Sequence, residues 1–217
     1  YDPLLGTWTT PDAYAGEVRD PMSQKPYMWN RNNSVKYGDP SGFDYIQLYD
    51  IRFGLGYLGH AAQFIITDMK KQSGVLLCLC GAKDLRGTPI VIVEKGVSLV
   101  SLIRGHGASV SARYDLGVYV RETKTQDAER IQFFADLTHT SRYVFDNSAN
   151  TNGPRDMNCI RACVAADEHV GAGPNKSGKN NDLLPNENLQ DVAAGGGTVE
   201  SLEDILQQMR DETLPPK

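Results

Sequence analysis

The 217-residue chain contains no apolar run of about 18 residues or more, so the sequence predicts no membrane-spanning helix. The chain has no excess of positive charge: it contains 22 Lys and Arg residues and 27 Asp and Glu residues, which gives a formal net charge of −5. This balance argues against nucleic acid as a partner, because nucleic-acid binding depends on a basic surface. The first residues also lack the pattern of a secretory signal peptide.

Cysteine is scarce, and its spacing is not typical of a zinc site. Cys78 and Cys80 are separated by one residue, and Cys159 and Cys163 lie one helical turn apart. Tetrahedral zinc favours a gap of about two to four residues in a knuckle turn. One residue between Cys78 and Cys80 is too few, and the three residues between Cys159 and Cys163 are expected in a helix and not in a turn. A disulfide framework is not expected in a chain with such an apolar core. We therefore predict no metal and no cofactor, and we expect Cys78, Cys80 and Cys163 to be buried free thiols.

Composition divides the chain into three segments. Residues 1–43 are rich in Pro, Gly and Asn and show short β-like pieces without a helix pattern. Residues 44–170 hold apolar strand candidates followed by helices, which predicts an α+β domain; the strands are expected at 58–68, 74–82, 88–94 and 116–123, and the helices at 125–137 and 158–170. Residues 171–217 are expected to form a flexible linker and an amphipathic helix at 198–212.

Two residues of the α+β domain could form a nucleophile and its base. Cys159 is expected at the start of the helix over 158–170, where unpaired amides and the helix dipole lower the pKa of a thiol. His60, on the strand over 58–68, could accept the thiol proton and later protonate the leaving group. The backbone amide of Cys159 would then help to hold the oxyanion. Taken singly, each residue is more typical of a core position, and His106 is the best substitute for His60.

Four short motifs occur in an order that is found in a known class of enzymes. They are Gly59-His60-Ala61-Ala62, Tyr114-Asp115, Thr125-Gln126-Asp127 and Asn158-Cys159. In this order they resemble the circularly permuted papain-like hydrolases of the NlpC/P60 type, over roughly residues 56–168. The resemblance implies a sheet packed on the helix that carries the nucleophile Cys159, with His60 as the base. Relatives orient the histidine from the next strand, but residues 74–82 lack such a group, which leaves Asp68, Asn158 or a backbone carbonyl.

The first segment carries a second resemblance. Its anchor residues are Tyr1-Asp2-Pro3, Leu5-Gly6-Thr7-Trp8, Pro11-Asp12, Asn30, Asn32-Asn33, Tyr37 and Asp39-Pro40-Ser41-Gly42. Together they resemble the closing segment of the core domain of Rhs (YD-repeat) proteins, a β-shell that encloses a variable C-terminal toxin. The resemblance implies that the toxin begins at Asp44 and that a secretion system, of type VI, delivers it into target cells. The implied partners are the remainder of the Rhs shell and a cognate immunity protein.

Rhs cores of this type release their toxin by cleaving themselves after a DPxG motif. The resemblance assigns the two aspartates of this reaction to Asp12 and Asp39, and the cleaved bond to Phe43–Asp44. Two carboxylates that share one proton can activate water and protonate the amide in turn. Aspartate next to proline or glycine is also common in turns, so a structural role is the alternative.

These observations predict an effector toxin that acts as a cysteine peptidase or amidase on target-cell protein or peptidoglycan. The reaction would pass through an acyl-thioester on Cys159, and His60 would assist its hydrolysis. Acyltransferases and deamidases use the same pair of groups, so both stay open. Two further alternatives are an ADP-ribosyltransferase, which would need a nicotinamide dinucleotide and not Cys159, and a non-catalytic binding module.

Overall fold

The computed structural model describes residues 44–51, 59–105, 113–144, 156–174, 185–194 and 197–211. The chain divides into two units, Tyr1–Ser41 and Gly42–Pro215, and all of the described residues belong to the second unit. Three residues of the expected self-cleavage site, Asp12, Asp39 and Phe43, lie outside the described residues. The second unit is a mixed α+β domain, which confirms the predicted class.

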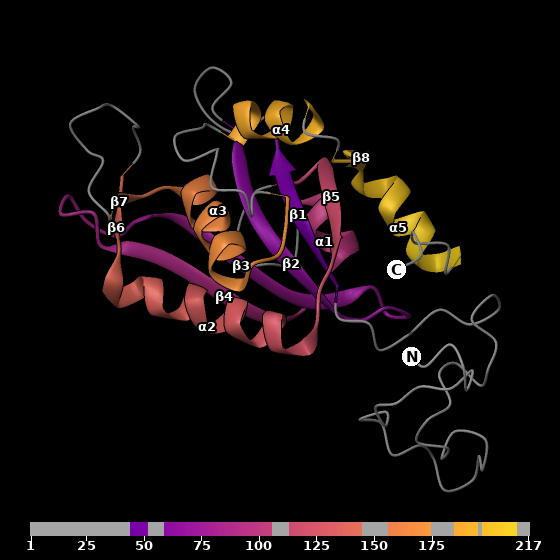
Figure 1. Ribbon diagram of the computed structural model, residues 1–217, viewed down its shortest axis with the longest axis horizontal. Coiled ribbons are helices and arrows are strands. Elements are labelled where there is room, and N and C mark those ends of the chain that lie inside the picture. The colour runs from indigo at the N-terminus through magenta and orange to yellow at the C-terminus, as the bar shows by residue number, and fades with distance from the viewer. Residues whose placement is uncertain are drawn as a thin grey trace, which may run out of the picture. The chain divides into compact units, whose positions relative to one another are not determined.

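Six antiparallel strands form the central sheet in the order β4-β3-β2-β1-β5-β8 (Figure 1). These strands are β1 Asp44–Asp50, β2 His60–Asp68, β3 Ser73–Ala82, β4 Pro89–Ser98, β5 Leu116–Arg121 and β8 Glu200–Ser201. A separate parallel pair consists of β6 Arg142–Tyr143 and β7 Asp156–Met157. The helices are α1 Leu99–Arg104, α2 Lys124–Thr140, α3 Cys159–Val170, α4 Pro185–Ala194 and α5 Leu202–Asp211.

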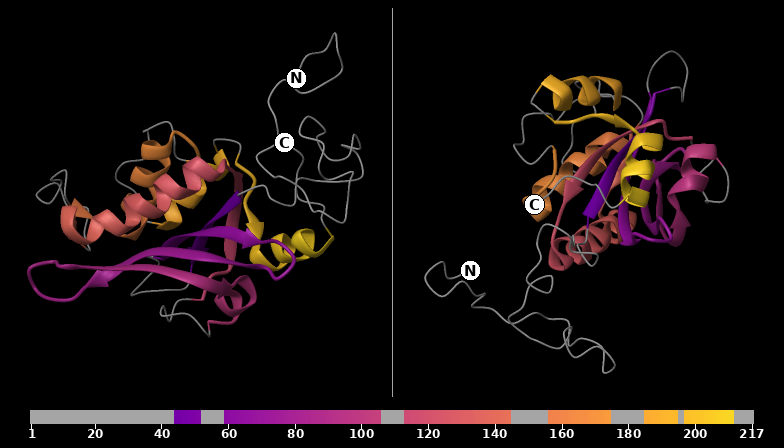
Figure 2. Two further views of the ribbon diagram at one scale, coloured as in Figure 1. Left: turned by 90° about the horizontal axis from the view of Figure 1, so that it is seen from below. Right: turned by 90° about the vertical axis from the view of Figure 1, so that its right-hand side faces the viewer.

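Helices cover both faces of this sheet (Figure 2). On one face α2 and α3 pack against β2, β3 and β4, and the apolar residues there form a core that includes Ala61, Ile65 and Cys163. On the other face α1 and α5 pack over a second core that includes Phe64 and Cys78. The arrangement is therefore three-layered, with the sheet buried between two layers of helices.

The strand β1 was not predicted, yet it lies at the centre of the sheet between β2 and β5. Every one of its residues is buried, and successive residues such as Tyr45 and Ile46 belong to the two different cores. The polar residues Asp44, Gln47 and Asp50 interrupt its apolar residues, so the strand shows neither a continuous apolar run nor the alternation by which strands are recognised. Its first residue, Asp44, accepts a hydrogen bond from the hydroxyl of Tyr119.

The other predicted elements appear with shifted limits. Helix α2 begins earlier than expected because Thr123, and not Thr125, caps it in a reciprocal arrangement with Gln126. The segment expected to be only a connector contains α4, whose Val192 packs into the first core. Helix α5 buries Leu202, Ile205, Leu206 and Met209 against the second core, so this part of residues 171–217 belongs to the α+β domain.

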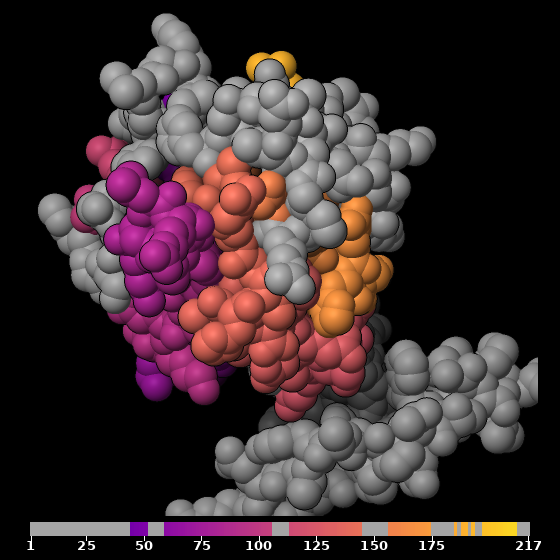
Figure 3. Space-filling model, turned by 90° about the vertical axis from the view of Figure 1, so that its left-hand side faces the viewer, coloured from indigo at the N-terminus to yellow at the C-terminus, as the bar shows by residue number. Residues whose placement is uncertain are grey.

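The turn between β3 and β4 lies beside the end of α2, on the side of the molecule that Figure 3 shows. There the amide of Tyr143 donates a hydrogen bond to the carbonyl of Gly87 at 2.7 Å.

Among the described residues, no helix is long and apolar enough to span a membrane.

Candidate functional site: a helix N-terminal thiol and a histidine beside two cysteines

The position of Cys159 agrees with the sequence prediction, because α3 begins at this residue. Asn158 caps the helix: its side-chain oxygen accepts a hydrogen bond from the amide of Arg161 at 2.9 Å. The preceding strand β7 is held by Arg142, whose guanidinium donates to both carboxylate oxygens of Asp156 at 2.9 and 3.0 Å. Cap and ion pair together hold Cys159 at the helix N-terminus.

Opposing effects act on the Cys159 thiol. Its side chain is buried, with 7% of the residue exposed, and this burial raises the pKa to about 11. The backbone amides of Ala61, Ile160 and Cys159 itself oppose the shift, because hydrogen bonds to the sulfur stabilise the thiolate. The resting thiol is therefore protonated at neutral pH, although it has donors around it that favour the charged form.

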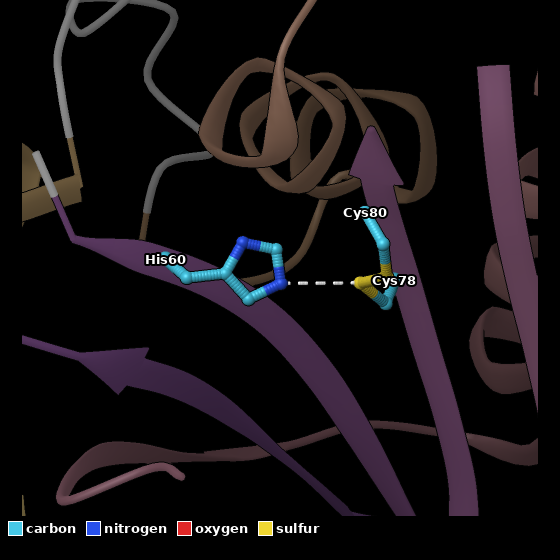
Figure 4. Close-up of side chains that lie close together, drawn as sticks. All are labelled: His60, Cys78 and Cys80. Carbon is cyan, nitrogen blue, oxygen red and sulfur yellow. Dashed lines mark hydrogen bonds between the residues drawn. A yellow bond between two sulfur atoms is a disulfide. The ribbon is translucent and has the colours of Figure 1, made fainter. Parts of the chain in front are cut away.

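His60 is the first residue of β2 and is also buried, with 6% of the residue exposed. Its Nε2 atom lies 3.2 Å from Sγ of Cys78 (Figure 4), and its ring centroid lies 6.0 Å from that of Tyr114. Burial lowers the pKa of His60 to about 4, and the charge of Asp50 acts in the opposite direction. The imidazole is therefore neutral at pH 7, which is the form that a general base requires.

The two predicted catalytic side chains occupy opposite faces of β2. Successive side chains of a strand point to opposite faces, so His60 shares its face with Ala62 and Phe64, while Ala61 faces α3. Cys159 packs in the core that contains Ala61. The structure thus brings the Cys159 sulfur to the backbone amide next to His60, and directs the His60 ring to Cys78 on the other face.

Of the groups expected to orient His60, Asp68 does not lie in position for that role. Asp68 is at the opposite end of β2, roughly 26 Å away at about 3.3 Å per residue, where it pairs with the Lys71 ammonium at 3.2 Å. Asn158 uses its side-chain oxygen for the helix cap. The carboxylate beside His60 is that of Asp50, which lies directly opposite His60 in the pairing of β1 with β2. Asp50 was not predicted as a site residue because the strand that carries it, β1, was not predicted.

Cys78 and Cys80 are not the buried free thiols that the sequence predicted, because they form a disulfide. The pairing of β3 with β4 shifts between Leu79 and Gly81, so Cys80 lies in a β-bulge. There the two Cα atoms are 5.6 Å apart, within the range of disulfides. Cys163 is a buried free thiol, which confirms that part of the prediction.

Of the three remaining histidines, two lie at helix ends and one lies outside the described residues. His169 lies in the last turn of α3, with its ring centroid 5.2 Å from that of Phe133, and His139 lies in the last turn of α2. His106, the substitute base, lies outside the described residues.

Comparison with known proteins identifies no relative: no family model, no curated protein and no solved structure matches the chain. The resemblances to the Rhs core and to the permuted papain-like hydrolases therefore depend on the quoted residues alone.

Proposed function

We propose that the domain starting at Asp44 is an effector toxin that hydrolyses an amide bond through a thioester on Cys159. The observation that carries this proposal is the setting of the thiol. Cys159 begins a capped helix, and the backbone amides of Ala61, Ile160 and Cys159 itself lower the pKa of its thiol against the larger effect of burial. Amides in this position stabilise a thiolate and are available to the oxyanion that forms when the sulfur attacks a carbonyl.

His60 supplies the base in this mechanism. It follows Gly59 and precedes Ala61, and its ring is neutral at pH 7. Because the pKa of the ring is about 4 and that of the buried thiol about 11, proton transfer is unfavourable in the resting structure and requires a rearrangement that places the ring against the sulfur.

The His60 ring lies on the face of β2 away from Cys159, so the transfer requires the start of β2 to rearrange and carry the ring to the face of α3. The pairing of β2 with β3 begins only at Gln63 and Leu77, but His60 itself pairs with Asp50 of β1, so this local pairing must open. The charge of Asp50, which favours the charged form of His60, would stabilise the imidazolium that results.

The substrate class follows from this chemistry and from the resemblance to the Rhs core. A thioester mechanism suits a peptide bond of a target-cell protein or of a peptidoglycan stem peptide, and it also suits acyl transfer or deamidation. We assign delivery to a type VI secretion system, release to cleavage of the Phe43–Asp44 bond by Asp12 and Asp39, and protection of the producing cell to an immunity protein.

The test is growth of bacteria that express the full chain in the cytoplasm or in the periplasm. We expect growth inhibition by the wild type, and loss of inhibition in Cys159→Ala and in His60→Ala. Cys163→Ala is the matched control, because this thiol is buried one turn further along the same helix and should not affect toxicity. The affected compartment separates a protein substrate from peptidoglycan.

Toxicity that survives Cys159→Ala would exclude the thioester mechanism. If that toxicity also depended on a nicotinamide dinucleotide, the ADP-ribosyltransferase alternative would replace the hydrolase. A wild-type chain that is soluble, folded and harmless in both compartments would favour the binding module.

A further inference from the structure

An imidazole and two sulfurs meet on one face of the sheet. A ring nitrogen of His60 and the sulfurs of Cys78 and Cys80 all lie within 4.8 Å of one another, and Nε2 is the nitrogen directed at Cys78 (Figure 4). The three residues belong to the neighbouring strands β2 and β3, so the sheet holds their backbones in place. Cys78 and His60 are buried, while Cys80 is half-buried, which gives a solute a route to the cluster.

The Cys78–Cys80 disulfide contributes little to the stability of the folded chain. A disulfide stabilises a protein mainly by restricting the unfolded chain, and this restriction grows with the length of the closed loop. Here the sequence separation is 2, so the closed loop is among the shortest possible. A dithiol reductant would convert the bond into two thiols and would itself become a disulfide, with two electrons and two protons transferred. The reducing interior of a cell favours this dithiol form.

We propose that His60, Cys78 and Cys80, with both cysteines reduced, form a binding site for one Zn²⁺ ion. Each thiol would lose its proton on binding, and Nε2 of His60 would be the third ligand. Tetrahedral zinc bonds require the two sulfurs about 3.8 Å apart and each sulfur about 3.6 Å from the nitrogen. In the disulfide form the two sulfurs are bonded and therefore closer than this, so they must separate on reduction; Nε2 already lies 3.2 Å from Sγ of Cys78, and all three ligand atoms lie within 4.8 Å of one another. A fourth position remains for water.

The surroundings of the cluster support this assignment. A histidine that binds metal usually donates its other N–H to a carboxylate, which fixes the ring and makes the ligand more basic. Asp50 is the buried carboxylate directly opposite His60 in the sheet, and its charge acts on the imidazole. The hydroxyl of Tyr114 is fully buried and has no hydrogen-bond partner among the described residues, and its ring lies beside His60.

The spacing of the two cysteines explains why sequence rules for zinc do not detect the site. Those rules describe knuckle turns, in which about two to four residues separate the ligands. On a strand, residues separated by one other residue share a face, so Cys78 and Cys80 are both directed to His60. The bulge at Cys80 shortens the distance between them further.

Zinc at this site would occupy the same nitrogen that the proposed hydrolase needs as its base. Bound zinc should therefore inhibit the hydrolysis assigned to Cys159, an inference that rests on the proposed function. Metal binding itself does not depend on that function, because Cys159 lies on the other face of β2.

The experiment uses the full chain, reduced with a dithiol and separated from it without oxygen. Zinc content is measured after dialysis, and titration with Co²⁺ reports thiolate ligands through their charge-transfer absorption. We expect one metal ion per chain in the reduced wild type and none in the oxidised protein. Cys80→Ser should lower the affinity at least tenfold, and Asp50→Asn should weaken binding while one ion still binds. Cys163→Ser and Cys159→Ala are the controls, and both should bind metal like the wild type.

A reduced, folded wild type that binds no Co²⁺ or Zn²⁺ would overturn the proposal. So would a thiolate absorption that persists in Cys78→Ser and Cys80→Ser but disappears in Cys163→Ser. Far-ultraviolet circular dichroism of each variant separates loss of a ligand from loss of the fold. Because Cys159→Ala retains the metal ligands, zinc binding by this variant is measurable even if the hydrolase proposal fails.

Discussion

The guanidinium of Arg130 donates a hydrogen bond to the carboxylate of Asp167 at 2.7 Å inside the fully buried core. A second carboxylate, that of Glu122, accepts from Nε of the same side chain at 3.0 Å. The guanidinium also lies 4.0 Å from the centre of the Tyr45 ring. These contacts join α2, α3 and the central strand β1, so one side chain connects the helix that carries Cys159 to the sheet.

Removal of one member of this network should be strongly destabilising. Asp167→Ala leaves the Arg130 charge without one of its partners in a site that water does not reach, and we expect a loss of about 3–5 kcal/mol in the free energy of unfolding. Urea denaturation measures it. The matched control is Arg142→Ala, because the pair of Arg142 with Asp156 is half-exposed and should contribute at most about 1 kcal/mol. Equal losses in the two variants would contradict a network that locks the core.

The protonation of Asp127 should make the free energy of unfolding depend on pH. Burial, and then the charge of Glu122, raises the pKa of Asp127 to about 8. Between pH 4 and 8 the folded protein thus retains a proton that the unfolded chain has released, so this contribution to stability is complete at low pH and disappears as the pH rises toward 8. The decline is at most about 1.4 kcal/mol per pH unit. Asp127→Asn should have a flatter profile over this range, measured by urea denaturation at several pH values.

The helix cap at Asn158 should influence both stability and the reactivity of Cys159. Asn158→Ala removes the acceptor for the Arg161 amide, and we expect a loss of roughly 0.5–2 kcal/mol. Asn158→Asp preserves an acceptor at the cap and should remain close to the wild type. The rate at which Cys159 is alkylated, measured by mass spectrometry, should also differ between the two variants. Identical stabilities of Asn158→Ala and Asn158→Asp would show that the cap contributes nothing.

A methyl group at Gly117 should disturb the packing of α5. A Cβ atom there would lie 2.7 Å from Cγ2 of Ile46 and 2.7 Å from Cδ2 of Leu202. We expect Gly117→Ala to lower the free energy of unfolding by roughly 1–3 kcal/mol. In the double variant with Leu202→Ala the clash with α5 is relieved, so the combined loss should be smaller than the sum of the two single losses. Additive losses would indicate that α5 does not pack on β5 as described.

The predictions from sequence succeeded where local interactions decide the structure. The start of α3 at Cys159 follows from a capping asparagine and an apolar helical stripe, and both act within a few residues. Helix α5 likewise shows its buried face in the spacing of Leu202, Ile205, Leu206 and Met209. The core strand β1 was missed because the polar residues Asp44, Gln47 and Asp50 interrupt its apolar residues, so it shows neither the continuous apolar run that revealed β2 and β3 nor a regular alternation.

By itself, then, the sequence determined the α+β class, the strands β2 to β5, and the helix that begins at Cys159, since hydrophobic periodicity and helix capping are local properties. Only the tertiary structure decided what surrounds His60. Strand register places Asp50 opposite it, a bulge joins Cys80 to Cys78 beside it, and strand alternation directs its ring away from α3. These relationships depend on pairing between distant parts of the chain, and a shift of one residue in register would reverse the face of every side chain.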